Sequence, residues 1–486
     1  MQALAANILE HLYGFITILN VLLAITVIFL ERRNVGVTWA WLMILLFLPV
    51  VGFVLYMLFG QNLSRRKLYK LGAREQMVIR TVVNSQLEDL KDKTILFPDP
   101  ASEEYRDMII LNLQAGKALY TQENQVEIFT NGMDKFEALF QDIKNARKHI
   151  HLIYYIVQMD GTGKRLVEAL AEKAREGVEV RFLYDDIGSS HMTADFFKPL
   201  RVAGGQAVAF FPSRFPFLNI RVNYRNHRKL AIIDGTVGYI GGYNVGDEYL
   251  GLDPRFGLWR DTHLKIRGSA VLMMNSQFML DWNLSSANKV VPDTRYLPAA
   301  LPDSQVGIQI VSSGPNDSME HIRNAYIKMI NKAKTSIWIQ TPYLIPDESL
   351  LNALQLAALS GVDVRIMIPR TPDHRMVYWA TYSYLGNLLP YGVRCFLYGK
   401  GFLHAKTITV DSEVSSVGTA NFDIRSFKLN FEVNAFIYDT EVGRRLNGIF
   451  MEDLQECIEL TREMYDKRPI HHKMRESFVR LMSPIL

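Results

Sequence analysis

The apolar residues divide the chain into a hydrophobic N-terminal part and a longer mixed part. Leu12 to Leu30 is an almost unbroken apolar run, and Val37 to Gly60 is a second run without a charged residue. A helix of about 20 apolar residues can cross the hydrocarbon core of a bilayer. A signal peptide fits the first run less well, because no basic segment precedes it and no small-residue cleavage site follows it. The pattern predicts two transmembrane helices within residues 1–60.

Basic residues around these runs predict the orientation of the chain. The short turn between the runs contributes Arg32 and Arg33. The exit from the second run contributes five basic residues, which are Arg65, Arg66, Lys67, Lys70 and Arg74. Because segments rich in Lys and Arg stay in the cytoplasm, we expect a multi-pass membrane protein with its larger part on the cytoplasmic side. Residues 61–105 are charged, lack a strong apolar period and are interpreted as a juxtamembrane linker.

After residue 105 the hydrophobic pattern occurs twice. "NARKHIHLIYYIV" from Asn145 and "KAKTSIWIQTPYLI" from Lys332 both lead from basic residues into a β-branched and aromatic run, which is typical of a buried strand. "LVEALAEKAREGVEVRFLYDD" from Leu166 and "LLNALQLAALSGVDVRIMIPR" from Leu350 both show helical spacing that ends at a glycine, followed by a strand. Two more strands around a turn follow in each copy.

This repeated order predicts an α/β protein built from two similar domains. Each domain is expected to have a mixed, mostly parallel sheet flanked by helices. Solenoids need three or more short units, so two copies of about 180 residues favour a pseudo-dimer instead. We place the first domain at residues 106–300 and the second at residues 301–486.

The same spaced set of polar residues occurs once in each copy. "NHRKLAIIDGTVGYIGGYN" from Asn226 and "LHAKTITVDSEVSSVGTAN" from Leu403 both contain His-x-Lys, four residues, Asp, six residues and Gly-[Gly/Thr]-x-Asn. The two sets are His227, Lys229, Asp234 and Asn244, and His404, Lys406, Asp411 and Asn421. A single His-x-Lys on a strand is commonly a solvated surface, but its recurrence at one spacing favours a shared function.

Two such sets facing each other would supply the groups needed for substitution at a phosphodiester. One imidazole can attack phosphorus and form a phosphohistidine. The other can protonate the leaving alkoxide and later deprotonate the incoming alcohol. The lysines and asparagines can stabilise charge on the phosphate oxygens. We group Asp234 and Asp411 with the catalytic residues, although a turn position would also let them accept backbone hydrogen bonds.

A reactive imidazole needs a hydrogen-bond acceptor at its second nitrogen. Glu432, in "LNFE" after the second motif, is the candidate for orienting His404. Asp261, in "WRDTH" after the first motif, is the candidate for His227. An ordinary surface carboxylate is the alternative interpretation of each.

Composition excludes several other classes of protein. Lys and Arg total 54 and Asp and Glu total 50, so a histone-like polyanion-binding protein is not expected, and no nucleic-acid partner is predicted. The motifs contain no Glu or Cys at a ligand spacing, and we predict neither a metal nor another cofactor. Cys395 and Cys457 match neither a disulfide framework nor a zinc ribbon and are interpreted as buried apolar residues.

The paired motif resembles the HKD motif of the phospholipase D superfamily. The N-terminal runs, "TPYLIPD" at Thr341, "NFDIRSF" at Asn421 and the terminal "SPIL" are similar to the bacterial cardiolipin synthases. This resemblance covers essentially the whole chain and implies phosphatidyl transfer in the bacterial cell membrane. One phosphatidylglycerol would give its phosphatidyl group to a histidine and release glycerol, and a second would attack to form cardiolipin. The family implies His227 as nucleophile and His404 as general acid and base.

The expected partners are phosphatidylglycerol in the membrane and an anionic lipid surface. The segment from Pro212 to Asn226 mixes aromatic and basic residues, which fits docking on anionic lipid, with an ordinary ordered loop as the alternative. The C-terminal "HHKMRESFVRLMSPIL" is basic and amphipathic, and both a surface helix and a helix that caps the core are consistent with it.

Four other functions are weighed against this one. The same two-histidine chemistry would serve a phospholipase D-type hydrolase or a phosphatidylserine synthase, because the acceptor arrives after the covalent step. A nuclease of the same superfamily would need an extended basic groove, against which the balanced charge argues. A non-catalytic membrane scaffold is disfavoured by the intact His and Lys of both motifs.

Overall fold

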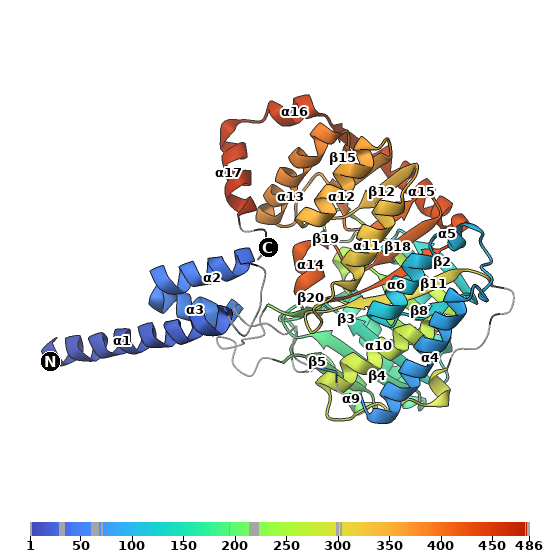
Figure 1. Ribbon diagram of the computed structural model, residues 1–486. Helices are drawn as coiled ribbons and strands as arrows, with labels where there is room; N and C mark the ends of the chain where they lie inside the picture. Colours follow the sequence, from blue (N-terminus) through green and yellow to red (C-terminus); the bar gives the residue numbers. More distant parts are fainter. Residues whose placement is uncertain are drawn as a thin grey trace. The chain divides into compact units, whose positions relative to one another are not determined.

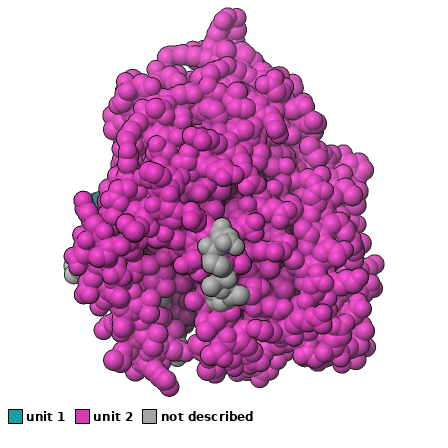
Figure 2. Space-filling model, turned by 90° about the vertical axis from the view of Figure 1, so that its right-hand side faces the viewer, with its two compact units in different colours: residues 1–66, 211–224, 315–318 teal, residues 67–210, 225–314, 319–486 magenta. Residues whose placement is uncertain are grey.

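The structure is a computed structural model that describes residues 2–28, 35–59, 68–69, 71–193, 195–212, 223–297, 301, 304–481 and 483. The chain separates into two compact units, coloured separately in Figure 2. The first unit comprises residues 1–66, 211–224 and 315–318, and the second comprises residues 67–210, 225–314 and 319–486. The basic residues at 32, 33, 65–67 and 70, most of the basic aromatic segment (213–222) and the last three residues lie outside the described part.

The N-terminal apolar runs form three helices: α1 (Gln2–Thr26), α2 (Val35–Phe47) and α3 (Pro49–Phe59). Within the described ranges, no helix combines the length and the apolar character that crossing a membrane requires. The second run was predicted as one span, but it divides at Leu48 into helices of 13 and 11 residues. The physical reason is Pro49, which lacks an N–H and begins a new helix. The predicted pair of spanning helices is therefore not found.

The first half of the second unit contains a seven-stranded mixed sheet. Its strand order is β2 (Asn124–Phe129), β10 (His263–Gly268), β8 (Val237–Gly241), β7 (Leu230–Ile233), β3 (His149–Tyr154), β4 (Glu179–Asp185) and β5 (Gln206–Phe210). Only the β3–β4 and β4–β5 pairs are parallel. The prediction of a mostly parallel sheet is thus wrong, because the motif strands and their neighbours pair antiparallel.

Helices cover both faces of this sheet, and strand β3 shows why. Its Ile150 and Leu152 join the apolar cluster formed with α7 (Gly132–Asn145) and α8 (Gly161–Arg175). The alternate residue His151 faces α10 (Ala270–Ser285), where its ring stacks on Phe278 at a centroid distance of 4.3 Å. Successive side chains of a strand point to opposite faces, so a strand covered on both sides is buried throughout.

The second half repeats the same strand order. The equivalent strands are β11 (Gly307–Ser313), β20 (Asn430–Tyr438), β18 (Val414–Gly418), β17 (Thr407–Val410), β12 (Ser336–Gln340), β14 (Asp363–Pro369) and β15 (Arg394–Tyr398). The edge strands β1 (Tyr120–Thr121) and β21 (Cys457–Leu460) extend this sheet. The helices α11 (His321–Lys332), α12 (Glu348–Leu359) and α15 (Thr440–Leu454), labelled in Figure 1, correspond in chain order to α7, α8 and α10 of the first half. The predicted duplication is confirmed.

The segment before the first sheet packs on the second half. Helices α4 (Ala73–Lys91) and α6 (Arg106–Gly116) contribute Leu90 and Met108 to an apolar cluster with Val311 of β11. Strand β1 pairs with β11, and Gln309 donates hydrogen bonds to carbonyls of α6 and the following turn. Residues 73–121 were expected to be a linker and the start of the first domain, but they complete the second one because their apolar faces are buried there.

Short strands cross between the halves and position the motifs. β6 (Arg225–Asn226) pairs in parallel with the start of β20, and β16 (Gly401–Leu403) pairs in parallel with β9 (Leu258–Arg260). The remaining elements are α5 (Ala101–Glu104), α9 (Lys198–Val202), α13 (Arg375–Leu388), α14 (Ile424–Lys428), α16 (Arg462–Asp466), α17 (Ile470–Arg480), β13 (Leu344–Ile345) and β19 (Phe422–Asp423). β6 ends immediately before His227, and β16 ends immediately before His404.

Candidate active site

The two motif histidines sit where a strand of one half meets a strand of the other. The backbone N–H of His227 donates to the carbonyl of Phe431 at 3.0 Å. The backbone N–H of His404 donates to the carbonyl of Arg260 at 2.7 Å. The two contacts are equivalent under exchange of the halves. Through these contacts, the backbone of each motif histidine is held by a residue of the opposite half.

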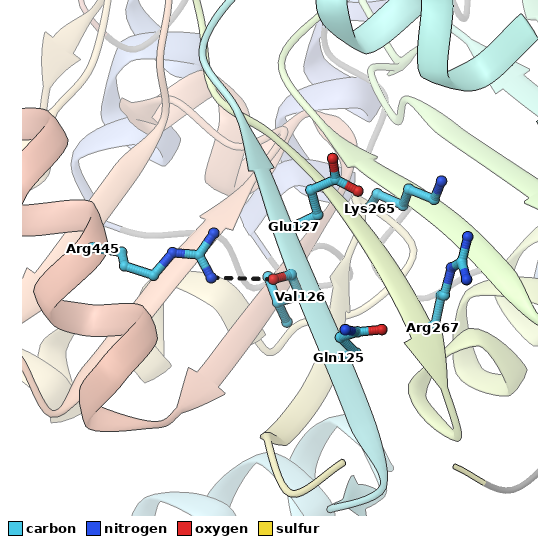
Figure 3. A pocket seen from close by; sticks show the side chains of 6 residues that line it. All are labelled: Gln125, Val126, Glu127, Lys265, Arg267 and Arg445. Atoms are coloured by element: carbon cyan, nitrogen blue, oxygen red, sulfur yellow. Dashed lines mark hydrogen bonds between the residues drawn. The ribbon is translucent and has the colours of Figure 1, made fainter. Parts of the chain in front are cut away.

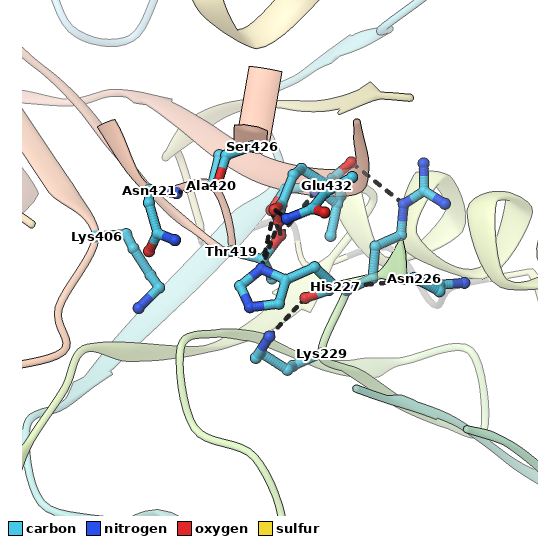
Figure 4. A network of polar contacts seen from close by, with 12 residues as sticks. Asn226, His227, Lys229, Lys406, Thr419, Ala420, Asn421, Ser426 and Glu432 are labelled. Atoms are coloured by element: carbon cyan, nitrogen blue, oxygen red, sulfur yellow. Dashed lines mark hydrogen bonds and ion pairs between the residues drawn. The ribbon is translucent and has the colours of Figure 1, made fainter. Parts of the chain in front are cut away.

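Each imidazole is also oriented by a carboxylate of the other half. His227 Nδ1 lies 2.9 Å and 3.1 Å from the two carboxylate oxygens of Glu432, as Figure 4 shows. His404 Nδ1 lies 2.6 Å from Asp261 Oδ2. Both carboxylates are fully buried. With the Nδ1 proton held by an acceptor, a neutral imidazole keeps its lone pair at Nε2, which is the atom that can react.

These pairs correct the expected assignment. Sequence proximity suggested Glu432 for His404 and Asp261 for His227, and the structure pairs them the other way round. The physical reason is the strand crossing, which places the end of β9 beside His404 and the start of β20 beside His227. All four residues were identified from the sequence, but their partners were not.

Both orienting carboxylates are held in their charged form. Burial opposes the ionisation of Glu432, but His227 and Lys229 outweigh it and lower the carboxyl pKa. Burial likewise opposes the ionisation of Asp261, and Lys406 and His404 lower its pKa on balance. Each carboxylate can therefore stabilise a positive charge that develops on its imidazole during a reaction.

A buried arginine holds the backbone of each orienting carboxylate. Arg228 Nε donates to the carbonyl of Glu432 at 3.2 Å, and its guanidinium forms an ion pair with Asp281 of α10 at 2.7 Å. The hydroxyl of Tyr69 donates to the same Asp281 at 2.7 Å. Arg228 was not among the residues predicted from the sequence. Its position between His227 and Lys229 could have indicated it, because a residue between two motif positions projects to the opposite face of an extended segment.

The other orienting carboxylate, Asp261, is held by the arginine that precedes it in the first half. Arg260 Nη1 donates to the carbonyl of Asp261 at 2.5 Å, and Arg260 Nη2 forms an ion pair with Asp453 of α15 at 2.7 Å. Gln340 Nε2 also donates to Asp453 at 2.7 Å. These groups are buried and mutually satisfied, so they are expected to hold the site rigidly.

The residue after the first motif glycine, Gly242 or Thr419, lies against the orienting carboxylate in each half. Thr419 Oγ1 donates to Glu432 Oε2 at 2.5 Å, and Asn430 Nδ2 donates to Oε1 at 3.1 Å. At the equivalent position Gly242, an added Cβ would lie 2.1 Å from Asp261 Oδ1. The structure shows that the Asp261 carboxylate occupies the space a side chain would need.

The two motif lysines lie in the same buried region. Lys229 Nζ donates to the carbonyl of His227 at 2.6 Å, and Lys406 Nζ donates to the carbonyl of His404 at 2.5 Å. Burial lowers the pKa of Lys229 to about 7 and that of Lys406 to about 8, and the charge of Lys406 contributes to the first shift. A bound anion would favour the charged form of both ammonium groups. The two lysines are therefore suited to bind an anion.

The same environment keeps the imidazoles neutral while the site is empty of anion. Burial and the Lys406 charge lower the pKa of His404 to about 4. Burial also lowers the pKa of His227, and both lysines act in the same direction. A neutral imidazole is the nucleophilic form, and a phosphodiester anion between the rings would raise the pKa of the one that must donate a proton.

The two motif asparagines differ in what they contact. Asn244 Oδ1 accepts from the backbone N–H of Ile156 at 3.2 Å, and its Nδ2 donates to the hydroxyl of Tyr249 at 3.3 Å. Asn421 is equally buried, but its Oδ1 has no hydrogen-bond partner within the described part of the chain. Contact with a phosphate oxygen would need the Nδ2 donor of either asparagine, and in Asn244 that donor already bonds to Tyr249.

Two aromatic rings not identified from the sequence pack against the imidazoles. The ring centroid of Tyr155 lies 4.9 Å from that of His227, and the centroid of Trp259 lies 5.1 Å from that of His404. Tyr155 lies in the run from Asn145 that was predicted as a strand, and Trp259 lies two residues before the candidate Asp261. Aromatic residues beside candidate site residues were the available signal.

The motif aspartates lie at the far ends of their strands. Asp234 follows β7, five residues beyond Lys229, which is roughly 16 Å along an extended chain. Its carboxylate accepts backbone N–H groups of Arg147, Lys148 and His149 at 2.7–3.0 Å. Asp411 accepts three backbone N–H groups of residues 334–336 in the same way, each at 2.8 Å. These contacts favour a structural role for both aspartates over the catalytic role expected from the sequence, because their carboxylates connect a turn to the neighbouring strand.

Replacement of Asp234 by alanine is expected to destabilise the fold and spare catalysis. It leaves three backbone donors without an acceptor, which costs about 1–3 kcal/mol. The residue has φ +54°, which Asn tolerates well, so Asp234→Asn should retain most of the stability. Chemical unfolding and kcat of the purified variants test this. A collapse of kcat in an Asp234→Ala protein of unchanged stability would restore the catalytic assignment.

A separate hollow on the surface contains no motif residue. It has a volume of about 380 Å³ and is lined by Gln125, Val126, Glu127, Lys265, Arg267 and Arg445 (Figure 3). Lys265 is paired with Asp142 at 2.7 Å. No group of three or more His, Cys, Asp or Glu among the described residues is arranged to hold a metal ion. The paired motifs remain the chemically equipped site.

Comparisons with known proteins give a consistent result. The family described as "Cardiolipin synthase, PLD-like domain" matches residues 139–254 and 326–454, and "Phospholipase_D-nuclease N-terminal" matches residues 18–61. The chain is 52% identical over 484 residues to the "Major cardiolipin synthase ClsA" of Bacillus subtilis, covering 99% of this chain and 100% of that one. It is also 52% identical to a cardiolipin synthase of Oceanobacillus iheyensis, with the same coverage.

A solved structure supports the fold independently. The crystal structure of a phosphatidylserine synthase from Haemophilus influenzae superposes with a TM-score of 0.61 at 14% sequence identity, covering 78% of this chain and 100% of that one. At this identity the likeness concerns the fold alone.

Proposed function

The chain belongs to the cardiolipin synthase family of phospholipase D-like proteins, and from this premise we propose that it joins two molecules of phosphatidylglycerol into cardiolipin and glycerol. The observation that supports this most directly is the crossed arrangement, in which each histidine is oriented by a carboxylate of the other half. Such an arrangement makes one site with two imidazoles and two lysines. The enzyme is thus a phosphatidyltransferase that needs both halves.

In the first step His227 acts as the nucleophile. Its Nε2 attacks the phosphorus of one phosphatidylglycerol, a P–N bond forms, and the bond from phosphorus to the glycerol headgroup oxygen breaks. His404 donates a proton to that oxygen, and glycerol leaves. The Glu432 carboxylate, hydrogen-bonded to Nδ1, stabilises the positive charge that appears on the His227 ring.

In the second step the covalent intermediate is transferred to lipid. The free glycerol hydroxyl of another phosphatidylglycerol gives its proton to His404 and attacks phosphorus, and the P–N bond to His227 breaks. Asp261 holds His404 in the orientation that both proton transfers require. Lys229, Lys406 and Asn421 stabilise the negative charge on the non-bridging oxygens in both transition states. Fixed cations of this kind can serve phosphoryl chemistry by charge stabilisation.

We further propose that the enzyme works at the cytoplasmic surface of the bacterial membrane. The helices α1, α2 and α3 expose many large apolar side chains, among them Phe15, Ile18, Trp39, Leu46 and Phe47. An exposed apolar surface of this extent fits contact with lipid better than contact with water. Both substrates are anionic lipids, so this attachment would keep the site close to donor and acceptor.

The proposed reaction can be tested with one substrate. Purified protein reconstituted in liposomes receives phosphatidylglycerol alone, and the products are resolved by mass spectrometry. Cardiolipin and glycerol in equal amounts are expected. Phosphatidic acid as the main product would mean hydrolysis, and phosphatidylserine formed only after serine is added would mean a different acceptor. Either result would overturn the proposal.

A further inference from the structure

The helix α17 carries a large apolar surface that is exposed. Ile470, Met474, Phe478 and the following Leu481 have between 66% and 79% of their surface accessible. They are spaced four, four and three residues apart, so they form one stripe along the helix. A stripe of this kind is usually covered in a soluble protein.

The opposite side of α17 is firmly packed. Val479 is buried in an apolar cluster with Ala380 and Tyr384 of α13, beside which α17 lies in Figure 1. Glu476 is buried as well and pairs with Arg468 at 2.7 Å. The helix therefore combines the two alternatives left open by the sequence. It packs on the core with one side and presents apolar residues with the other.

Basic residues border the apolar stripe on both sides. At helical spacing, Lys473 and Arg480 lie along one edge, and His471 and Arg475 lie along the other. Glu476 is the one acidic residue from Ile470 to Leu481, and Arg468 neutralises it. An apolar stripe between basic edges is complementary to a bilayer of anionic lipid, in which acyl chains lie below negatively charged phosphates.

A hollow lies between this helix and the start of α14. It has a volume of about 460 Å³ and is lined by Tyr384, Ile424, Ser477, Arg480, Leu481 and Ser483. Ile424 begins α14, directly after Asp423 and three residues after Asn421 of the second motif. The end of the apolar stripe at Leu481 thus lines the same hollow as the first residue of α14.

We propose that α17 is an interfacial helix that docks the catalytic unit onto anionic lipid. Its apolar residues enter the acyl-chain boundary, and the basic edges contact the lipid phosphates. The adjoining hollow then faces the bilayer and admits part of a lipid on its way to the site. The docking surface goes beyond the proposed reaction, and it rests on that reaction only for the choice of phosphatidylglycerol as the anionic lipid.

A fluorescent probe at residue 474 tests the docking without any turnover. We would label Met474→Cys in the full chain with a polarity-sensitive dye, after Cys457→Ser leaves only the buried Cys395. The protein is reconstituted in phosphatidylcholine liposomes with and without phosphatidylglycerol. We expect a blue shift and protection from an aqueous quencher in the presence of phosphatidylglycerol. A probe at Leu359→Cys, on the exposed face of α12, should not respond.

Two results would overturn the docking. In the first, the label on α17 behaves like the label on α12. In the second, the signal changes with protein concentration in the absence of anionic lipid, which would show that a second copy of the chain covers the stripe.

The consequence for catalysis is tested in mixed micelles. The double variant Met474→Ser and Phe478→Ser should lower kcat/KM about tenfold when phosphatidylglycerol is dilute in the micelle surface, because two apolar anchors are lost. The kcat at high surface concentration should change little. The double variant Leu356→Ser and Leu359→Ser, equally exposed on α12, is the control. Equal effects of the two double variants would contradict the proposal.

A wild-type protein that makes no cardiolipin would refute the proposed reaction and leave the probe result standing.

Discussion

Replacing either His227 or His404 with alanine is expected to lower the rate of cardiolipin formation by about four orders of magnitude or more, as is usual when a group that acts within a catalytic unit is removed. Without His227 no phosphohistidine can form. Without His404 the glycerol oxygen must leave unprotonated and the acceptor hydroxyl must attack without a base. The rate is measured as cardiolipin formed per unit time from phosphatidylglycerol in liposomes, by mass spectrometry.

The controls distinguish lost chemistry from lost structure. His191, an exposed histidine outside the motifs, should tolerate alanine without change in rate. Both motif variants should unfold at the same denaturant concentration as the wild type, within experimental error. A wild-type rate in either single motif variant would show that one imidazole is enough. A phosphatidyl-enzyme trapped in the His404 variant and absent from the His227 variant would assign the nucleophile.

The crossed carboxylates lead to the second large effect. Glu432→Gln and Asp261→Asn should each lower the rate by about two to four orders of magnitude, because the ring loses the anion that fixes its tautomer and stabilises its charge. Both substitutions keep the size of the side chain. The two should differ when the donor lipid carries a p-nitrophenyl group in place of glycerol, since this leaving group needs no proton.

With the activated donor, release of p-nitrophenol reports the first step alone. With this donor, the first step should return toward the wild-type rate in both Asp261→Asn and His404→Ala. It should stay slow in both Glu432→Gln and His227→Ala. The pattern follows from the hydrogen bonds by which Asp261 orients His404 and Glu432 orients His227. If Glu432→Gln were rescued and Asp261→Asn were not, His404 would be the nucleophile. If the carboxylate variants did not follow the histidines they contact, the functional pairing would be wrong.

The sequence by itself determined the duplicated α/β architecture and the residues of the site. Periodicity is local, so it shows in each copy where a strand follows a helix, and repetition at one spacing singles out His227, Lys229, His404 and Lys406. The balance of charged residues led us to expect no nucleic-acid partner. These properties depend on residues that are close in the chain, and the resemblance to the cardiolipin synthases rests on the same motifs.

Only the tertiary structure decided which carboxylate orients which histidine. Glu432 is 28 residues from His404 and 205 residues from His227, yet it contacts His227 because β6 and β20 pair across the halves. The hydrogen bond from buried Arg228 to the Glu432 carbonyl depends on the same packing between the halves. A local pattern records which face of an element a residue occupies. It contains no information on which remote backbone completes that face, because strand pairing between halves is set by how the two sheets bury their apolar surfaces together.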